Sequence, residues 1–332
     1  MNRTTEKILA ALRGVDGDVS GEVLCRSLSI SRAAVWKHIQ TLRGLGYRID
    51  SATQRGYRLV TPPNTPYPWE IKPYLKTSGI GREIVYQDVV ESTNALAVEA
   101  ARSQNAGEGY CVVADTQQRG RGRLQRSWFS PPGRNLYLSL VLRPSVAPAA
   151  VPQLSLVAAM ALARAVREFV SDARLQVKWP NDVFIEGRKV AGILCESASE
   201  PDRVQYAVVG IGVNVNLAQH DFPSAIADTA GSLRMFCKHD IERPLLAAAT
   251  LNIFESVYEE WTGSGLEGLL EELEAVSFLR GRQVVVETPR GQRLGRVRGM
   301  TEMGALRLEV ADGEREEIVY CGDVRVRPTS DT

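Results

Sequence analysis

The sequence predicts an α+β fold in three parts: a short helical module, a central mixed β-sheet with helices, and a small all-β tail. Three observations support this prediction. The first sixty residues combine three short helical patterns with one hairpin pattern. A proline-rich stretch follows, after which strand and helix patterns alternate from about residue 69 to 275. From residue 281 onward, the chain shows only short strands separated by turn residues.

Bulk composition is that of an ordinary globular protein, and it argues against a disulfide-rich secreted protein and against a membrane protein. The chain has 332 residues, of which 44% are hydrophobic and 24% charged, with a net charge of +1. That length predicts two or three domains, and that charge gives no general argument for nucleic acid. Five cysteines without a CxxC pair, behind a polar N-terminus, indicate a cytoplasmic protein with free thiols. Residues 151–166 are too short and too polar to span a membrane.

The N-terminal module has the pattern of a winged helix-turn-helix. Ser20 is a plausible N-cap for a helix over residues 21–28, and Ser31 for a helix that ends near Leu45. Two helices joined by so short a turn are typical of a helix-turn-helix. Alternating residues 47–50 and 57–60, around a turn at Gln54–Gly56, predict a β-wing.

Local charge favours DNA as the partner of this module. Residues 1–60 hold ten Lys or Arg side chains against five Asp or Glu side chains. A positive excess on a groove-sized module is the usual electrostatic footprint for a duplex. The alternative is a solvated helical domain that makes protein contacts. The residues predicted to contact DNA are Ser31, Arg32, Ala33, Trp36, Lys37 and Arg55.

Prolines and pattern changes predict the domain boundaries. The proline-rich run that starts at Thr61 forces extended backbone and separates its neighbours semi-rigidly. The predicted division is a DNA-binding domain over 1–62, a linker over 63–68, a catalytic domain over 69–276 and a C-terminal domain over 277–332.

Strands and helices of the central part form one predicted sheet with helices on one side. The predicted strands are 84–90, 110–114, 136–142, 175–178, 183–185, 190–197 and 206–215, and the predicted helices are 94–102, 154–170 and 245–261. The tail is predicted to be a small barrel of five strands, 284–286, 294–297, 305–310, 316–320 and 324–326, punctuated by Gly291, Gly304 and Asp312–Gly313.

The strongest chemical motif is QQRGRGRLQRSW over residues 117–128, in which four arginines alternate with two glycines. Glycine lets backbone amides approach an anion, and guanidinium forks match carboxylate and phosphate oxygens. This arginine loop would suit a ligand that carries both groups. The alternative is an exposed, disordered basic loop. Neither a P-loop nor a dinucleotide-binding pattern is present, since position 125 is Gln.

A second motif, KWPND over residues 178–182, precedes Lys189 by seven residues. A hairpin would return Lys189 to the neighbourhood of Asp182. Asp182 has the chemistry to hold Mg²⁺ against phosphates, and Lys189 to neutralise a carboxylate and an α-phosphate. The alternative is an ordinary turn with two surface lysines.

Two further motifs can each be explained either by a structural role or by ligand binding. Ser92 and Thr93 in ESTN, between a strand and a helix, are suited to N-capping but also to binding a polar ring substituent. The pattern GIGVN over residues 210–214 permits close approach of a ligand, with Asn214 as donor and acceptor, or forms a β-bulge.

As an ordered set, these motifs resemble the biotin protein ligases of the bacterial type that also repress transcription. The resemblance covers nearly the whole chain, from the winged helix-turn-helix through the ligase domain to an SH3-like C-terminal barrel. It implies ATP and Mg²⁺ as cofactors, biotin as substrate and biotinyl-5′-AMP as bound intermediate. It also implies three macromolecular partners: the biotin carboxyl carrier protein of acetyl-CoA carboxylase, operator DNA, and a second copy of the chain when the adenylate is bound.

The resemblance assigns roles to the matching positions. Implied catalytic residues are Lys189, Arg121 and Arg123. Implied biotin-binding residues are Ser92, Thr93, Asn94, Gln117, Gly120, Arg121, Gly122, Arg123, Lys189, Gly192 and Gly210. Implied ATP- or adenylate-binding residues are Arg126, Trp128, Asn181, Asp182, Asn214 and Arg327, with Asp182 also the magnesium ligand. Two positions depart from the family pattern: Gln125 replaces a glycine of the loop, and Glu91 stands where Asp is common.

The implied reaction has two steps. The biotin carboxylate attacks the α-phosphate of ATP and pyrophosphate leaves, while Lys189 and the arginines stabilise the developing charge. The neutral amine of an acceptor lysine then attacks the mixed anhydride, without a covalent enzyme intermediate. The adenylate would also act as corepressor, by favouring dimers that bind a two-fold operator of the biotin synthesis genes.

Three alternatives stand beside this interpretation. A lipoate or octanoate ligase shares the central fold, but the arginine loop, KWPND and the DNA module argue against it. A biotin sensor without catalysis is disfavoured by the presence of Lys189 and Asp182. An active ligase whose N-terminal domain no longer binds DNA is compatible with the sequence.

Overall fold

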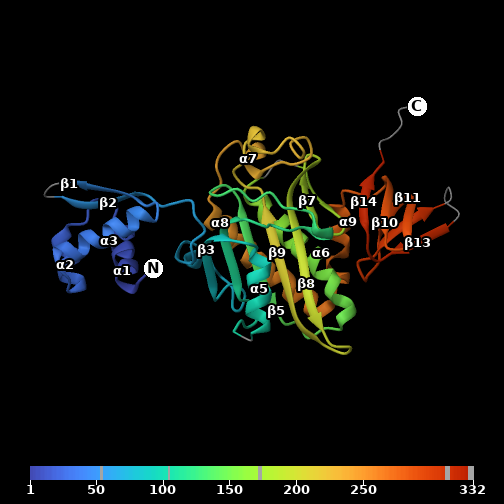
Figure 1. The fold of residues 1–332 in the computed structure, drawn as a ribbon, viewed down its shortest axis with the longest axis horizontal. Helices are drawn as coiled ribbons and strands as arrows, with labels where there is room; N and C mark the ends of the chain where they lie inside the picture. The colour runs from blue at the N-terminus through green and yellow to red at the C-terminus, as the bar shows by residue number, and fades with distance from the viewer. Residues whose placement is uncertain (53–54, 104, 171–173, 311–314, 328–332) are drawn as a thin grey trace. The chain divides into compact units, whose positions relative to one another are not determined.

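The computed structural model describes residues 1–52, 55–103, 105–170, 174–310 and 315–327. The chain divides into two compact units, Met1–Asn64 and Thr65–Thr332 (Figure 1). Within the second unit, a single apolar core contains residues of both the central sheet and the C-terminal strands. The separate boundary at residue 277 therefore stays a prediction.

The N-terminal unit has the predicted helix-turn-helix and wing. It comprises α1 (Arg3–Arg13), α2 (Gly21–Leu28), α3 (Arg32–Gly44), β1 (Arg48–Ala52) and β2 (Gly56–Thr61). Both predicted caps are present, because the Ser20 hydroxyl accepts from Glu22 N and the Ser31 hydroxyl accepts from Ala34 N. The predicted Gln54 turn position lies outside the described residues.

All seven predicted strands of the central part join one sheet. They are β3 (Ile84–Val90), β4 (Cys111–Gln117), β5 (Leu136–Leu142), β6 (Leu175–Lys178), β7 (Asp182–Ile185), β8 (Arg188–Ser199) and β9 (Val204–Val213). Their order is β3-β4-β5-β9-β8-β7-β6. β3 and β4 are parallel and the other pairs antiparallel, so the sheet is mixed as predicted.

β4 extends three residues beyond its predicted end. Its register with β3 continues to Gln117, which lies opposite Val90. The polar run Asp115–Gln117 therefore belongs to the sheet instead of the following loop. This extension fixes the residues that lead into the arginine loop.

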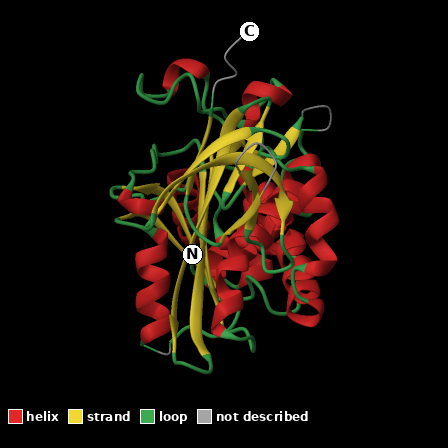
Figure 2. Ribbon diagram, turned by 90° about the vertical axis from the view of Figure 1, so that its right-hand side faces the viewer, coloured by secondary structure: helices red, strands yellow, loops and turns green. Residues whose placement is uncertain are grey.

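The prediction that helices cover one side of the sheet is wrong, because helices cover both faces (Figure 2). α6 (Leu154–Arg167), α8 (Arg243–Ser264) and α9 (Glu267–Ala275) share the main apolar core. α5 (Thr93–Arg102) packs through Ala97 and Ala101 on the opposite face, against Val112, Val141 and Val208. Small side chains on α5 allow this close approach, and the strands are accordingly apolar on both faces.

The described part of the second unit also has six shorter helices. They are α4 (Pro68–Ile71), α7 (Leu233–Cys237), and the 3₁₀ helices η1 (Lys72–Tyr74), η2 (Arg123–Gln125), η3 (Pro148–Gln153) and η4 (Gln219–Asp221). The helical stretch Pro148–Arg167 is long and apolar enough to cross a membrane by length and composition alone. Since 72% of that window is buried inside the protein, it has the character of a core helix.

The five predicted C-terminal strands are confirmed as an antiparallel sheet. They are β10 (Gln283–Thr288), β11 (Gly291–Met300), β12 (Leu306–Val310), β13 (Arg315–Val319) and β14 (Asp323–Val326). The order β13-β12-β11-β10-β14 places β13 and β14 at the two edges. This strand order is compatible with the predicted barrel. The predicted turn at Asp312–Gly313 lies outside the described residues.

Candidate active site

A cavity of about 220 Å³ lies between the central sheet and the arginine loop. It contains most of the residues predicted to bind ligand, although they come from segments far apart in the sequence. The predicted residues that line it are Ser92, Thr93, Asn94, Gln117, Arg121, Gly122, Arg123, Arg126, Trp128, Asn181, Asp182, Lys189, Gly192, Gly210 and Asn214. The four motifs thus meet at one place.

One end of the cavity is a buried polar cluster at the start of α5. Ser92 occupies the N-cap position but makes no capping bond with its side chain, contrary to the structural explanation offered above. Instead, Gln117 Oε1 accepts from the backbone N–H of Thr93 at 2.9 Å. Ser139 Oγ lies within hydrogen-bond distance of Thr93 Oγ1 (2.8 Å) and Asn94 Oδ1 (2.7 Å). Preordered hydroxyl and amide groups of this kind suit a urea-like ring.

Glycines of β8 and β9 form the floor of the cavity. A Cβ on Gly210 would lie 2.0 Å from Asn94 Oδ1, and one on Gly212 would lie 2.7 Å from Trp128 Nε1. Gly192, the cross-strand partner of Gly212, also lies against the Trp128 ring. The β8–β9 register is continuous here, so the β-bulge explanation of the GIGVN pattern is wrong. Glycine is needed because side chains pack directly onto the strand backbone.

The arginine loop is folded over the cavity. Trp128 N donates to Gly120 O (2.8 Å), and Gly122 N donates to Arg126 O (2.7 Å). Gly120 does not line the cavity, but a Cβ there would lie 2.6 Å from Ser130 Oγ. At the tip, Gln125 has a φ of +58°, a left-handed conformation that favours glycine. Gln125 therefore carries backbone strain at the loop tip.

The C-terminal sheet holds this loop from outside. Arg126 forms an ion pair with Asp323, with Nη2 and Oδ2 separated by 2.6 Å, and Arg123 donates to Gly322 O at 3.1 Å. Asp323 lines the cavity, whereas the predicted Arg327 is exposed and lies outside its lining. Partial burial opposes ionisation of Asp323, but its bond to Arg126 and the nearby positive charges hold its pKa below the usual value. The acid is therefore charged at neutral pH.

Removing this contact is expected to loosen the loop. In Asp323→Asn, tryptic cleavage within residues 121–126 should be several-fold faster than in the wild-type protein, because Arg126 loses its charged partner. Glu316→Gln, which breaks the exposed Arg307 pair of the same sheet, should leave cleavage unchanged. Equal cleavage rates in Asp323→Asn and the wild type would contradict a holding role.

The lowered pKa of Asp323 also predicts how this contact depends on pH. Its contribution to stability is fully present above the ordinary aspartate pKa, about 3.9. It is lost as pH falls through the lower folded-state pKa. The urea midpoints of wild type and Asp323→Asn should therefore differ at pH 6 and converge in strong acid. A difference that grew as the pH fell would contradict this sign.

Lys189 and Asp182 form the charged centre of the site. β7 and β8 make the predicted hairpin, and Lys189 Nζ lies 2.6 Å from Asp182 Oδ1. The same ammonium lies 5.4 Å from the centroid of the Trp128 ring. Asn181 is fixed beside them, since its Nδ2 donates to Ile193 O at 2.7 Å. The KWPND segment forms a turn, as the structural alternative predicted. Together with the hairpin that follows, it also places the Asp182 carboxylate and the Lys189 ammonium in the cavity.

The donor set restricts how a metal ion would bind. Among the described residues, no group of three or more His, Cys, Asp or Glu side chains could hold a metal. Asp182 offers one carboxylate, which fits an ion such as Mg²⁺ that takes few protein ligands and several phosphate oxygens. The same carboxylate is already paired with Lys189, so an ion there would share it.

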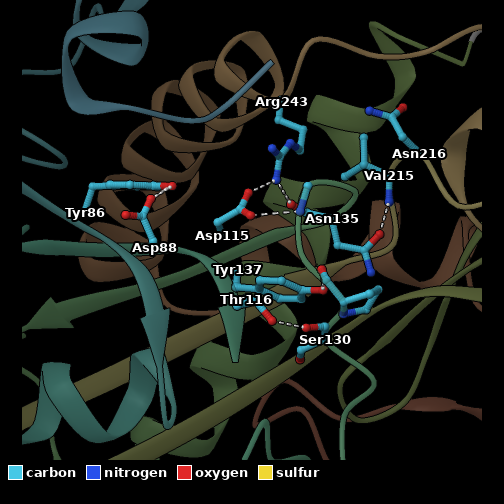
Figure 3. Close-up of polar contacts among 12 residues, drawn as sticks. Tyr86, Asp88, Asp115, Thr116, Ser130, Asn135, Tyr137, Val215, Asn216 and Arg243 are labelled. Carbon is cyan, nitrogen blue, oxygen red and sulfur yellow. Dashed lines mark hydrogen bonds and ion pairs between the residues drawn. The ribbon is translucent and has the colours of Figure 1, made fainter. Parts of the chain in front are cut away.

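A buried network supports the opposite end of the cavity (Figure 3). Asn135 Nδ2 donates to Asn214 Oδ1 (3.3 Å), and Asn135 O accepts from Arg243 Nη1 (2.9 Å). Arg243 is 2% exposed and pairs with Asp115 at 2.8 Å. Figure 3 shows Asp115 and Arg243 pointing toward one another, with Asn135 beside them and also joined to Val215.

Sequence reasoning missed several residues of the site. These are Phe129, Tyr137, Ile193, Leu194, Ile226, Thr229, Ala230 and Asp323 in the lining, with Ser139, Asn135, Asp115 and Arg243 behind it. Ser127, Ile211 and Gly212 also line the cavity; they lie within the motifs but were given no role of their own. A lone Ser inside the apolar strand LYLSLVL was a usable signal for Ser139, since buried hydroxyls need partners. Asp323 and Arg243 had no local signal.

The predicted DNA-contact residues of α3 share one exposed surface. Ser31, Arg32, Ala33, Trp36 and Lys37 are all exposed, and Trp36 is 57% exposed. The other face of α3 is buried through Val35, Ile39 and Leu42. Arg55 in the wing is exposed and lies 3.7 Å from Asp18. An exposed basic helix face with a large aromatic side chain suits a groove-binding helix.

Family models match both units. The biotin/lipoate A/B protein ligase family matches residues 86–214, and a helix-turn-helix domain family matches residues 4–58. The first match covers the start of α5, the arginine loop, KWPND, Lys189 and the β9 glycines.

Whole-chain relatives and solved structures agree with these matches. The chain is 36% identical over 328 residues to the bifunctional ligase/repressor BirA of Bacillus subtilis, covering 98% of this chain and 100% of that protein. It is 33% identical to BirA of Escherichia coli, over 87% of this chain and 88% of that protein. The biotin protein ligase from Aquifex aeolicus, solved with biotin and ATP, is 27% identical and has a TM-score of 0.63, covering 74% of this chain and 99% of that chain.

Proposed function

Since this chain belongs to the biotin protein ligase family, among its bifunctional ligase/repressors, we propose how its cavity and its N-terminal unit carry out the two activities. The protein activates biotin with ATP to biotinyl-5′-AMP, transfers biotin to an acceptor lysine, and represses transcription through its helix-turn-helix unit. The observation that carries the ligase assignment is the meeting of the arginine loop, Lys189 and Asp182 in one cavity.

Biotin binds with its ring at the α5 end and its carboxylate near Lys189. The groups beneath the ring are Thr93, Asn94 and Gln117, whose hydrogen bonds to Ser139 and to one another fix them before binding. The glycines of β8 and β9 let the side chains of Asn94 and Trp128 pack onto the strand backbone and line the cavity beside the ligand. Preorganised polar groups in a largely buried pocket are what recognition of a small rigid ring requires.

Adenylation joins a biotin carboxylate oxygen to the α-phosphorus and releases pyrophosphate. Lys189, Arg121 and Arg123 stabilise the negative charge that develops on the α-phosphate. Trp128 and the folded arginine loop then cover the mixed anhydride and exclude water. Mg²⁺, held through Asp182, would supply charge neutralisation on the phosphates.

Transfer uses the neutral amine of an acceptor lysine, which attacks the biotinyl carbonyl and displaces AMP. The acceptor we propose is a biotin carboxyl carrier protein. Cys195, whose pKa burial raises to about 12, is not suited to act as a thiolate nucleophile. We propose that transfer proceeds directly, without a covalent enzyme intermediate.

The ligase assignment is tested by following labelled biotin onto a carrier domain in the presence of ATP and Mg²⁺. We expect label on a single acceptor lysine, and none when ATP is omitted. Lipoate and octanoate serve as competing substrates in the same assay. Efficient transfer of either fatty acid without transfer of biotin would overturn the assignment in favour of a lipoate-type ligase.

Adenylate formation also regulates DNA binding in this proposal. The folded loop favours a homodimer that binds a two-fold operator of biotin synthesis genes, and the carrier protein competes for the dimer surface. We place both activities in the cytoplasm. Operator binding that did not respond to biotin with ATP would contradict this coupling.

Arg32→Ala is expected to weaken operator binding and to reduce the slope of log affinity against log salt by about 1, since one phosphate contact is lost. Biotin transfer should be unchanged, because Arg32 belongs to the N-terminal unit. Lys7→Ala, also exposed but on α1, is the matched control and should retain the wild-type slope. Equal slopes for Arg32→Ala and the wild type would remove α3 from the DNA interface.

A further inference from the structure

The amide of Asn214 is held in one orientation before any ligand binds. Its Nδ2 donates to Gly231 O (3.1 Å), and its Oδ1 accepts from Asn135 Nδ2 (3.3 Å). An amide group has two N–H donors and two acceptor lone pairs. These two bonds therefore leave one N–H and one lone pair of Asn214, in a fixed arrangement, for a ligand in the cavity.

Asn135 is the residue that sets this orientation. It is 0% exposed and is not among the cavity-lining residues, so its effect on a ligand is indirect, and its Nδ2 is hydrogen-bonded to the lining residue Asn214. Its Oδ1 accepts from Val215 N (3.0 Å) while its Nδ2 donates to Asn214. Because each end of the Asn135 amide has a different partner, a flip would set donor against donor and acceptor against acceptor.

Asn135 is itself anchored to α8 and, through Arg243, to Asp115 of β4 (Figure 3). Arg243 Nη1 donates both to Asn135 O (2.9 Å) and to Asp115 Oδ1 (2.8 Å). The second oxygen of Asp115 accepts from Gly133 N (2.9 Å). The segment that carries Asn135 is thus bound to β4 and α8 at once, and a buried charged network of this kind is rigid when fully satisfied.

We propose that Asn135 is a positioning residue for the nucleotide: it fixes the Asn214 amide so that its remaining N–H meets a ring-nitrogen acceptor of a purine base. The inference rests on the proposed assignment of Asn214 to the adenine side of the site. Biotin recognition lies at the other end of the cavity, where Asn135 makes no contact.

Asn135→Ala should raise the KM for ATP by about tenfold, which is the scale of one oriented hydrogen bond. The KM for biotin should stay within about twofold of the wild-type value. Asn135→Ser, which keeps an acceptor for Val215 N, should give the same split with a smaller loss of stability. Biotin binding measured on each variant defines the folded fraction.

Asn216→Ala is the matched control. Asn216 is a buried asparagine two residues after Asn214, bonded to Ile241 and outside the cavity lining. Its loss should lower stability without changing the ratio of the two KM values. A rise in the ATP KM equal to that of Asn135→Ala would overturn the proposal by showing a general loss of packing.

A double-mutant cycle tests this proposal separately from the assignment of Asn214 to the adenine side, on which it rests. If Asn135 acts through Asn214, then adding Asn135→Ala to Asn214→Ala should raise the ATP KM little further. Additive effects would overturn the positioning role while leaving Asn214 at the nucleotide. An Asn214→Ala variant with the wild-type ATP KM would instead refute the adenine assignment itself.

Discussion

Lys189→Ala is expected to lower the rate of biotinyl-5′-AMP formation by about 10²–10³-fold, the scale seen when one preorganised donor to a developing negative charge is removed. The Lys189 ammonium lies in the cavity, 2.6 Å from Asp182. Its removal takes a positive charge from the reacting phosphate and leaves the Asp182 carboxylate without this partner. Biotin-dependent exchange of pyrophosphate into ATP measures the step directly.

Two variants show whether charge or packing is responsible. Lys189→Arg keeps the positive charge and should retain more activity than Lys189→Ala, although its planar head changes the geometry. Lys178→Ala removes the lysine of KWPND at the end of β6, which lies outside the cavity lining and whose pKa is lowered by burial. Should Lys178→Ala reduce adenylation as strongly as Lys189→Ala, the assignment of Lys189 would lose its support.

Arg243→Met is expected to lower the free energy of unfolding by about 3–5 kcal/mol, the usual cost of removing one partner of a buried ion pair. Arg243 is 2% exposed and Asp115 is 20% exposed, so the remaining carboxylate is left in a poorly solvated site. Asn135 O also loses a donor. Urea unfolding, read as a change in midpoint at constant slope, measures the effect.

The control is an ion pair of the same type on the surface. Arg307→Met breaks the exposed Arg307–Glu316 pair and should change the urea midpoint little, because solvent screens this pair. Adding Asp115→Asn to Arg243→Met should recover part of the loss, since it removes the uncompensated charge. A loss in Arg243→Met no larger than in Arg307→Met would show that the buried pair does not stabilise the fold.

Most of the secondary structure and most of the cavity-lining residues could be predicted from local sequence patterns. Caps at Ser20 and Ser31, and strands such as Leu136–Leu142, depend on residues within a few positions of one another. The motif residues could be identified because glycine and arginine runs have few structural uses. Short-range patterns of this kind can be recognised from a single sequence.

Partners distant in sequence could not be found in the same way. Asp115 and Arg243 are 128 positions apart, and Arg126 and Asp323 are 197 positions apart. Nothing in the neighbourhood of an arginine reveals which carboxylate it meets after folding. The two-sided helix cover was missed for a related reason, since α5 uses small alanines whose pattern does not specify a face of the sheet.

The most direct test of the account loads the protein with labelled biotin and ATP, removes free nucleotide, and then adds carrier domain without ATP. We expect the label to be held non-covalently as biotinyl-5′-AMP and to pass to the acceptor lysine in a single turnover, while Lys189→Ala retains little label. Label that stays covalently attached to the protein, or a loaded wild type that transfers nothing until ATP returns, would contradict it.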